Sequence, residues 1–246
     1  MIDSHCHLDD LRFRQDLPSV LARAHQHGVE HFIIAGVRQS QWAIQDHLKR
    51  QYTGIFNAFG VHPWFCHEHS EASLQILAEQ LHDAVAVGEC GLDFMPNRPP
   101  QALQIQWFQW QIDLAEQHHL PLIIHTVKSA DTVFRLLKSH PSARGVIHGF
   151  SGSMQQAEQF MRLGFYIGIG TRAMHPRAKK IQQLAQNLPL SAMLLESDAP
   201  DGSPDQQLNE PYRLAELTCY LATLRNQHES TIVAACTHNS EELFQL

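Results

Sequence analysis

Long apolar runs and an excess of positive charge are both missing from this sequence of 246 residues. No stretch approaches the roughly 18–20 apolar residues that cross a bilayer, and the first residues lack the basic and apolar regions of a secretion signal. Lys and Arg number 18 against 25 Asp and Glu, a formal net charge of −7, which argues against binding of nucleic acid over a broad basic surface. We therefore expect a cytoplasmic protein without membrane contact, in which any nucleic-acid substrate is held locally.

Cysteine pairs are also missing. The chain has 5 cysteines, an odd and scattered set without a CxxC motif, which argues against both a disulfide framework and a zinc ribbon. We expect buried free thiols in a reducing compartment. Linkers, low-complexity tracts and short repeats are absent as well, and 43% hydrophobic with 17% charged residues is typical of a packed globular protein. The sequence predicts a single domain over residues 1–246.

Eight short apolar segments alternate along the chain with stretches of helical character. Because helices separate the strands, the strands should pair in parallel, and eight such units favour an α/β fold, the closed (β/α)8 or TIM barrel. An open, doubly wound sheet is the alternative, but no glycine-rich phosphate turn follows the first strand. The predicted strands cover residues 2–8, 31–37, 55–62, 84–93, 120–125, 145–148, 165–170 and 192–198. The predicted helices cover residues 16–28, 39–50, 70–82, 99–119, 130–139, 153–163 and 177–187, and two or three more follow Pro211.

The first strand delivers a His-x-His pair, His5 and His7. Side chains alternate along a strand, so both imidazoles face the same side, about 7 Å apart, which suits a single bound ion. Further polar side chains stand at the carboxyl ends of other apolar strands, where a barrel has its active site, and such residues must be paired or metal-bound. Those residues are Glu89, His125, His148 and Asp198. Four imidazoles and two carboxylates are too many for one tetrahedral ion but suit two divalent ions that share a carboxylate.

Eight motifs of the sequence together resemble the TatD family of metal-dependent hydrolases, the TatD-type deoxyribonucleases. They occur in the family's order and cover essentially the whole chain. The motifs are Asp3-Ser-His-Cys-His-Leu8, Gly60-Val-His-Pro63, Val87-Gly-Glu-Cys-Gly-Leu-Asp93, Ile124-His125, His148-Gly-Phe-Ser-Gly152, Leu195-Glu-Ser-Asp-Ala-Pro200, Asn209-Glu-Pro211 and Thr237-His-Asn-Ser-Glu-Glu-Leu-Phe244.

This resemblance implies a TIM barrel that cleaves DNA phosphodiester bonds with metal-activated water. It implies that the first ion is held by His5, His7, Glu89 and Asp198, and that the second ion shares Glu89 and takes His125 and His148. Asp198 would orient the attacking water or accept its proton. Histidine-rich ligation suits zinc or manganese, whereas phosphodiester hydrolysis often uses magnesium, so the metal stays open. We expect a monomer.

Substrate contacts are less clearly marked. The resemblance places His62 near substrate, although a histidine that is hydrogen-bonded in a turn ended by Pro63 is an equal alternative. Asp93 shares the side-chain parity of Glu89 and could contact the substrate or support a ligand. Many relatives carry an arginine directly after the histidine that corresponds to His125, but this chain has Thr126-Val-Lys128. Lys128 or Arg172 could then hold phosphate as a point charge.

Other side chains are expected to be structural. Glu196 shares parity with Asp198 and should lie one layer deeper in the barrel, where it needs a partner. Cys6 and Cys90 should face away from the ligands and pack. The aromatic cluster Trp107, Phe108 and Trp110 is interpreted as core packing, with a base-stacking platform as the alternative.

Two other functions remain open. Related barrels hydrolyse small amides, carbamates or esters with a similar pair of metals, and many of them bridge the ions with a carboxylated lysine where this chain has Glu89. A metal-stabilised binding protein without catalysis is the third possibility, which the complete ligand set disfavours.

Overall fold

The computed structural model describes residues 1–246, and its strands form one eight-stranded sheet in the order β1 to β8. Every neighbouring pair from β1–β2 to β7–β8 is parallel. The strands are β1 (Ile2–Cys6), β2 (His31–Ala35), β3 (Ile55–Phe59), β4 (Ala86–Asp93), β5 (Leu122–Val127), β6 (Gly145–Ile147), β7 (Phe165–Gly170) and β8 (Met193–Glu196).

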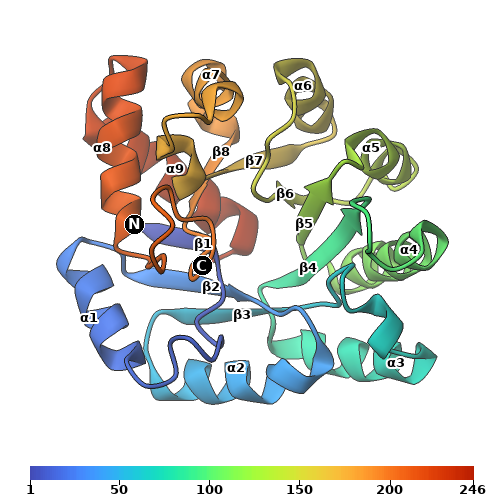
Figure 1. Cartoon of the computed structure of the whole chain (residues 1–246). Helices are drawn as coiled ribbons and strands as arrows, with labels where there is room; N and C mark the ends of the chain where they lie inside the picture. Colours follow the sequence, from blue (N-terminus) through green and yellow to red (C-terminus); the bar gives the residue numbers. More distant parts are fainter.

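A helix follows each strand, so every parallel pair is joined by a crossover (Figure 1). The α-helices are α1 (Leu17–Gln26), α2 (Gln39–Gln51), α3 (Glu71–Gln80), α4 (Gln101–His118), α5 (Ala130–Lys138), α6 (Met154–Arg162), α7 (Lys179–Asn187), α8 (Arg213–Arg225) and α9 (Glu229–Phe244). Short 3₁₀ helices are η1 (Cys66–Glu68), η2 (Leu81–Asp83), η3 (Thr171–Met174) and η4 (Leu190–Ala192). None of the helices is both long enough and apolar enough to span a membrane.

The first and last strands meet, so the sheet curves into a nearly closed barrel. Beyond the end of β8, the Asp198 amide donates to His5 O (2.9 Å), and the His7 amide donates to Ala199 O (2.7 Å). This arrangement confirms the predicted (β/α)8 barrel and excludes the open, doubly wound sheet.

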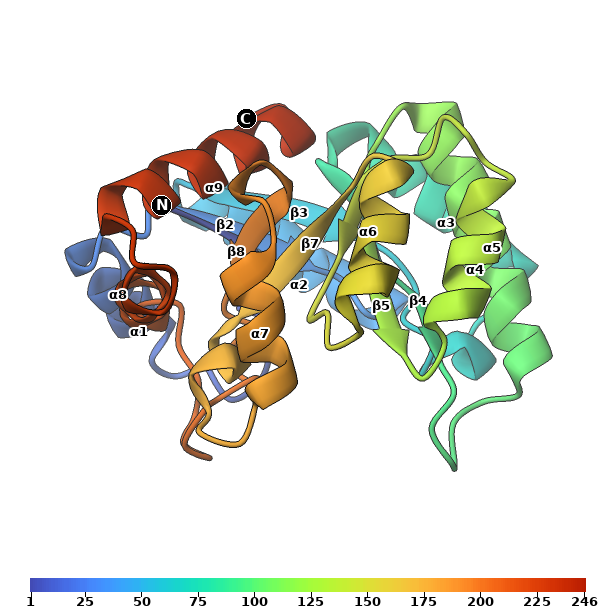
Figure 2. The ribbon, with the colours of Figure 1, turned by 90° about the horizontal axis from the view of Figure 1, so that it is seen from above.

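The amino-terminal end of the barrel interior is apolar. One buried side chain from each of seven strands packs there, and α9 adds Leu243 and Phe244. The strand residues are Ile2, Ile33, Ala58, Ala86, Ile123, Val146 and Leu194. In Figure 2, α9 lies across this end of the barrel. Because apolar side chains fill the amino-terminal end of the barrel, the polar side chains of the interior lie at the opposite, carboxyl end.

Two strands change side-chain parity part-way along the barrel. Ile2 and His5 both point inward although they are three residues apart, and the β1–β2 register shifts between Asp3 and Cys6. The register of β4–β5 shifts likewise between Val87 and Cys90, so Ala86 and Glu89 share the interior. Such irregularities re-aim side chains next to active sites. Strict alternation predicts that His5 and His7 share a face, but it does not predict these shifts.

Six of the predicted strands are shorter in the structure, and two of them end at least two residues before a predicted site residue, which follows on a loop. The strand predicted over residues 192–198 ends at Glu196, because Asp198 adopts a left-handed backbone with φ 58°. The strand predicted over residues 55–62 ends at Phe59, and the His62 amide instead donates to Val37 O (2.9 Å). Asp198 and His62 therefore lie on loops above the strand ends.

The outer core lies between the strands and the surrounding helices. Trp107 and Phe108 of α4 are buried in it, and Trp110 packs against it, which confirms the core-packing interpretation. All 5 cysteines are free, and Cys219 alone is exposed. Cys6 and Cys90 are buried and their thiols donate to Ile33 O and Ile123 O, away from the ligand cluster. The expectation of buried free thiols is therefore correct for four of them.

Candidate metal centre

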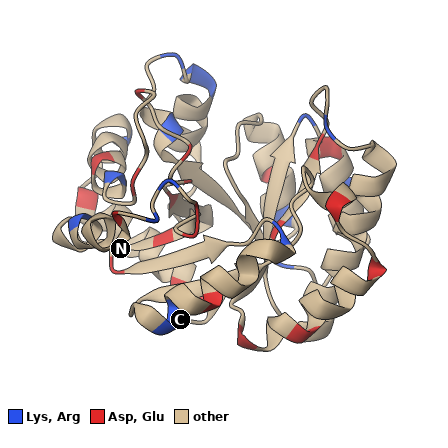
Figure 3. Ribbon diagram, turned by 60° about the horizontal axis from the view of Figure 1, so that its bottom comes forward, with Lys and Arg blue, Asp and Glu red and all other residues tan.

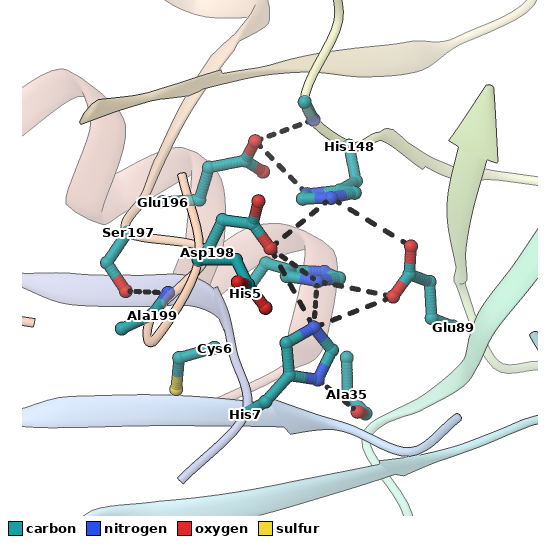
Figure 4. A network of polar contacts seen from close by, with 12 residues as sticks. His5, Cys6, His7, Ala35, Glu89, His148, Glu196, Ser197, Asp198 and Ala199 are labelled. Carbon is teal, nitrogen blue, oxygen red and sulfur yellow. Dashed lines mark hydrogen bonds and ion pairs between the residues drawn. The ribbon is translucent and has the colours of Figure 1, made fainter. Parts of the chain in front are cut away.

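Six polar side chains predicted from the sequence converge above the apolar interior, at the carboxyl end of the barrel. His5 ends β1 and His7 follows it, Glu89 lies on β4 and His125 on β5, and His148 and Asp198 follow β6 and β8. Figure 4 shows five of them pointing toward a common centre, with Cys6 turned away.

The first group of donor atoms consists of the histidine pair and two carboxylates. His5 Nε2 lies 3.2 Å from His7 Nε2, 3.5 Å from Glu89 Oε2 and 3.8 Å from Asp198 Oδ1. His7 Nε2 lies 3.7 Å from Glu89 Oε2 and 3.8 Å from Asp198 Oδ1. Nitrogen and oxygen atoms so placed can surround one cation, as the resemblance implies.

The second group contains a residue that the sequence predicts only as a substrate contact. His62, Glu89 and His125 offer ligand atoms within 4.8 Å of one another. His125 Nδ1 is hydrogen-bonded to Glu89 Oε1 (2.9 Å), and His62 Nε2 lies 3.4 Å from the same oxygen. His62 is buried, so it lies beside Glu89 rather than on the open surface.

His148 is shared between the groups rather than confined to the second. Its ring stacks on His5 with centroids 3.5 Å apart, and its Nε2 lies 3.8 Å from Asp198 Oδ1 and 3.9 Å from Glu89 Oε1. The structure thus groups His148 most closely with His5 and Asp198.

Further contacts orient two of the imidazoles. A carbonyl oxygen only accepts, so His7 Nδ1 donates to Ala35 O (2.9 Å) and its Nε2 keeps a lone pair for the cluster. His148 Nδ1 lies 3.1 Å from Glu196 Oε1, which also accepts from the Gly149 amide (2.6 Å). Glu196 is therefore one layer deeper, as parity predicts, and His148 is its partner. No sequence pattern marks the Ala35 carbonyl.

The loop that carries Asp198 is fixed by a buried network. Asn209 Nδ2 donates to Ser197 O (2.6 Å), and the Thr171 hydroxyl donates to the same oxygen (3.2 Å). The Ser197 amide donates to Asp3 Oδ1 (2.9 Å). These bonds hold the backbone on which Asp198 takes its left-handed conformation, which aspartate tolerates better than most residues.

Burial shapes the protonation of the cluster. It lowers the pKa of His5 to about 3 and that of His62 to about 4, which keeps their nitrogen lone pairs available. Burial opposes ionisation of Glu89, yet the imidazoles of His62 and His5 hold its pKa well below its usual value. Burial raises the pKa of Asp198 to about 6. Burial opposes protonation of His148, yet the Glu196 carboxylate raises the pKa of His148 to about 10. The site therefore combines an ionised Glu89, neutral His5 and His62, a cationic His148, and an Asp198 carboxylate that can take up a proton near neutral pH.

This donor set fits divalent metal ions. Imidazole nitrogens and carboxylate oxygens are ligands of zinc and manganese, and they occur here in overlapping groups. His5 Nε2 and His7 Nε2 lie 3.5–3.8 Å from the carboxylate oxygens of Glu89 and Asp198, which is longer than an ordinary hydrogen bond and is compatible with a cation shared between these atoms.

The predicted substrate contacts lie at different depths. Asp93 is 1% exposed, and its Oδ2 lies 3.5 Å from His125 Nε2, so it contacts a candidate ligand rather than the open site. Lys128 and Arg172 are exposed at the rim after β5 and β7. Lys and Arg are interspersed with Asp and Glu along the ribbon in Figure 3, in keeping with a local rather than a broad grip on an anionic substrate.

Comparison with known proteins places these motifs in one family. The family model described as "TatD related DNase" matches residues 2–245. The chain belongs to the TatD DNase family. A protein of Escherichia coli K12 named "Uncharacterized metal-dependent hydrolase YjjV" is 38% identical, with 100% of this chain and 98% of that protein aligned. The "3'-5' ssDNA/RNA exonuclease TatD" of Edwardsiella piscicida is 32% identical over 100% of both chains.

The fold agrees with this membership. The crystal structure of YjjV, a TatD homologue from Escherichia coli, superposes with a TM-score of 0.95 at 36% identity, covering 100% of this chain and 98% of that one. The protein is thus a metal-dependent hydrolase, and the family favours hydrolysis of phosphodiester bonds over the amidohydrolase alternative.

Proposed function

We propose that the protein is a two-metal phosphodiesterase that shortens DNA from an end. The observation that carries this proposal is the overlap of the donor groups at Glu89, whose two oxygens face different sets of imidazoles. One ion would be held by His5, His7, Glu89 and Asp198, and the other by Glu89, His125 and His148, with His62 close enough to assist. Zinc, manganese and magnesium are the candidate metals.

When bound, two divalent ions acidify water and neutralise the charge that builds up on a phosphate. The side chains of the protein orient the water, accept its proton and position the ligands. Asp198 has 24% of its side chain exposed, against 3% for Glu89, so it is the carboxylate that reaches the substrate side. Asp198 orients the attacking water and accepts its proton on a carboxylate oxygen. Glu89 would contribute one oxygen to each of the two ion sites. The Ala35 carbonyl and Glu196 keep the imidazoles of His7 and His148 in place.

DNA is the proposed substrate, and Lys128 and Arg172 at the rim are its proposed phosphate contacts. The relative from Edwardsiella piscicida named as a single-strand exonuclease supports attack from an end. We also propose that the protein acts in the cytoplasm, which its 5 unpaired thiols support, and that it acts as a monomer.

The decisive experiment strips the protein of metal, reloads it with magnesium, manganese or zinc, and follows cleavage of end-labelled single-stranded and duplex DNA. Stepwise shortening that requires metal is expected from the wild type. It should fall by at least about a thousandfold in Asp198→Asn, which removes the proton acceptor. Asp83→Asn is the matched control, because Asp83 lies on η2, before the amino end of β4, and is 63% exposed.

Metal-loaded, folded protein that leaves every DNA substrate intact would contradict the proposal. A panel of small amides, carbamates and esters would then test the amidohydrolase alternative on the same preparation.

A further inference from the structure

An aromatic ring and an arginine lie side by side next to the metal centre. Trp64 follows β3 and Arg98 follows β4, so two loops above the strand ends bring them together. The Arg98 guanidinium carbon lies 3.7 Å from the centroid of the Trp64 ring, a close cation–π contact. Trp64 is 38% exposed and the Arg98 side chain 32% exposed, so the pair borders solvent.

The carboxylate of Asp93 contacts both this pair and His125, one of the candidate metal ligands. Asp93 Oδ2 accepts from Trp64 Nε1 (2.5 Å) and lies 3.3 Å from Arg98 Nε. The same oxygen lies 3.5 Å from His125 Nε2. Asp93 is itself held in place, because the Met95 amide donates to its Oδ1 (2.9 Å). The guanidinium is therefore separated from a candidate metal ligand by one buried oxygen atom.

The Arg98 guanidinium is held in one orientation, but some of its hydrogen-bond donors have no partner. Its Nε faces Asp93 and its plane is covered by the indole, whereas its two terminal nitrogens donate no hydrogen bond within the protein. A guanidinium presents a fork that matches two phosphate oxygens, and one that is already oriented loses little freedom on binding. Lys128 and Arg172, the cations predicted from the sequence, are exposed and lack this support.

We propose that Arg98 binds a backbone phosphate of the substrate strand, and that Trp64 and Asp93 position its guanidinium for this contact. The proposal rests on the proposed phosphodiesterase function, because it assigns a phosphate-binding residue to that same site.

Four variants test the assignment: Arg98→Gln, Arg98→Lys, Trp64→Ala and, as a matched loss of one positive charge, Arg162→Gln. Arg162 is exposed at the end of α6, at the opposite end of the barrel. With metal-loaded protein and a single-stranded oligonucleotide, Arg98→Gln should raise KM about tenfold and leave kcat within about threefold, because it removes a binding contact. Arg98→Lys should recover part of the loss, and Trp64→Ala should lie between wild type and Arg98→Gln.

Binding without turnover provides a second readout. In an Asp198→Asn background, fluorescence anisotropy of a labelled oligonucleotide should show weaker binding in the Arg98→Gln double variant. The slope of log Kd against log salt concentration should fall by roughly 0.7, the value for one lost phosphate contact on a single strand. A purely structural role for Arg98 would lower thermal stability but leave this slope unchanged.

The outcomes separate the two proposals. Wild-type cleavage of DNA, together with an Arg98→Gln variant whose KM and salt slope match those of Arg162→Gln, would overturn the role of Arg98 alone. A wild-type protein that neither binds nor cleaves the oligonucleotide would overturn the proposed function, and the role of Arg98 with it.

Discussion

Glu196 is completely buried in the barrel, where its carboxylate faces the imidazole of His148. A lone buried carboxylate is costly, and His148 together with the Gly149 amide offsets that cost. The neighbouring strand leaves room for it, because a Cβ on Gly168 would lie 2.3 Å from Glu196 Oε2. At the scale of single residues, the candidate site therefore includes a buried carboxylate whose partners are His148 and the Gly149 amide.

Replacing Glu196 by Gln should weaken metal binding about 10- to 100-fold while the protein stays folded. Gln keeps the shape and can still accept from the Gly149 amide, but it removes the negative charge beside His148. Competition with a chromophoric chelator measures the affinity. Glu242→Gln is the matched control, because Glu242 is exposed and accepts only from the Tyr166 hydroxyl. Equal metal affinities in both variants would show that Glu196 does not support the ligand.

At the scale of elements, the close pairing of β4 with β5 sets the distance between Glu89 and His125. Gly91 pairs with His125 and has a φ of 117°, and a Cβ added to it would lie 2.2 Å from His125 O. Only glycine allows this approach, since both the backbone conformation and the space exclude a side chain.

Gly91→Ala should therefore lower the free energy of unfolding by more than about 3 kcal/mol, because strain and a backbone clash add together. Gly164→Ala is the comparison, since Gly164 has a φ of 84° but nothing within 4 Å of an added Cβ. It should cost only about 1–2 kcal/mol. Urea unfolding of metal-free protein measures both values, and similar losses for the two variants would contradict the steric argument.

The elements and the candidate ligands could largely be predicted from the sequence, because a strand has a fixed period and a barrel gathers strand ends at one rim. Polar residues at the ends of apolar segments, such as His125 and His148, carry that information directly. The Trp64–Arg98 pair could not be predicted. Both residues lie on loops, which have no period, and their contact depends on how two loops fold toward each other.

The register shifts in β1 and β4 could not be predicted from the sequence either. Nothing in the order of residues from Ala86 to Glu89 shows that the strand changes parity, because that change depends on pairing with β5. The sequence also does not predict that His62 is buried beside Glu89, because this position depends on a hydrogen bond from its amide to Val37 O rather than on a continuation of β3.

At the scale of the whole molecule, the barrel holds its shape through a large apolar core that is separate from the metal centre. Metal should therefore add stability without being required for folding. Ions at about 100 times their Kd stabilise the folded state by roughly 2.7 kcal/mol, which corresponds to about 5–10 °C in Tm for a chain of this size.

Calorimetry of stripped and reloaded protein checks this, with a smaller shift expected for Asp198→Asn, which lacks one ligand. A Tm that does not respond to metal would contradict binding at this site. Complete unfolding on metal removal, without any hydrolytic activity in the loaded protein, would instead favour a metal-stabilised binding protein.

The joining of β1 to the end of β8 has a consequence during synthesis. The proposed ligands His5 and His7 are made among the first residues, whereas Asp198 emerges only after about four-fifths of the chain, and the Asp198 amide must reach His5 O to close the barrel. A partly translated chain therefore carries two ligands of the proposed first ion but lacks the carboxylate that completes them. The chain is therefore expected to have no hydrolytic activity until the eighth strand and the loop after it have been synthesised and β1 has joined the end of β8.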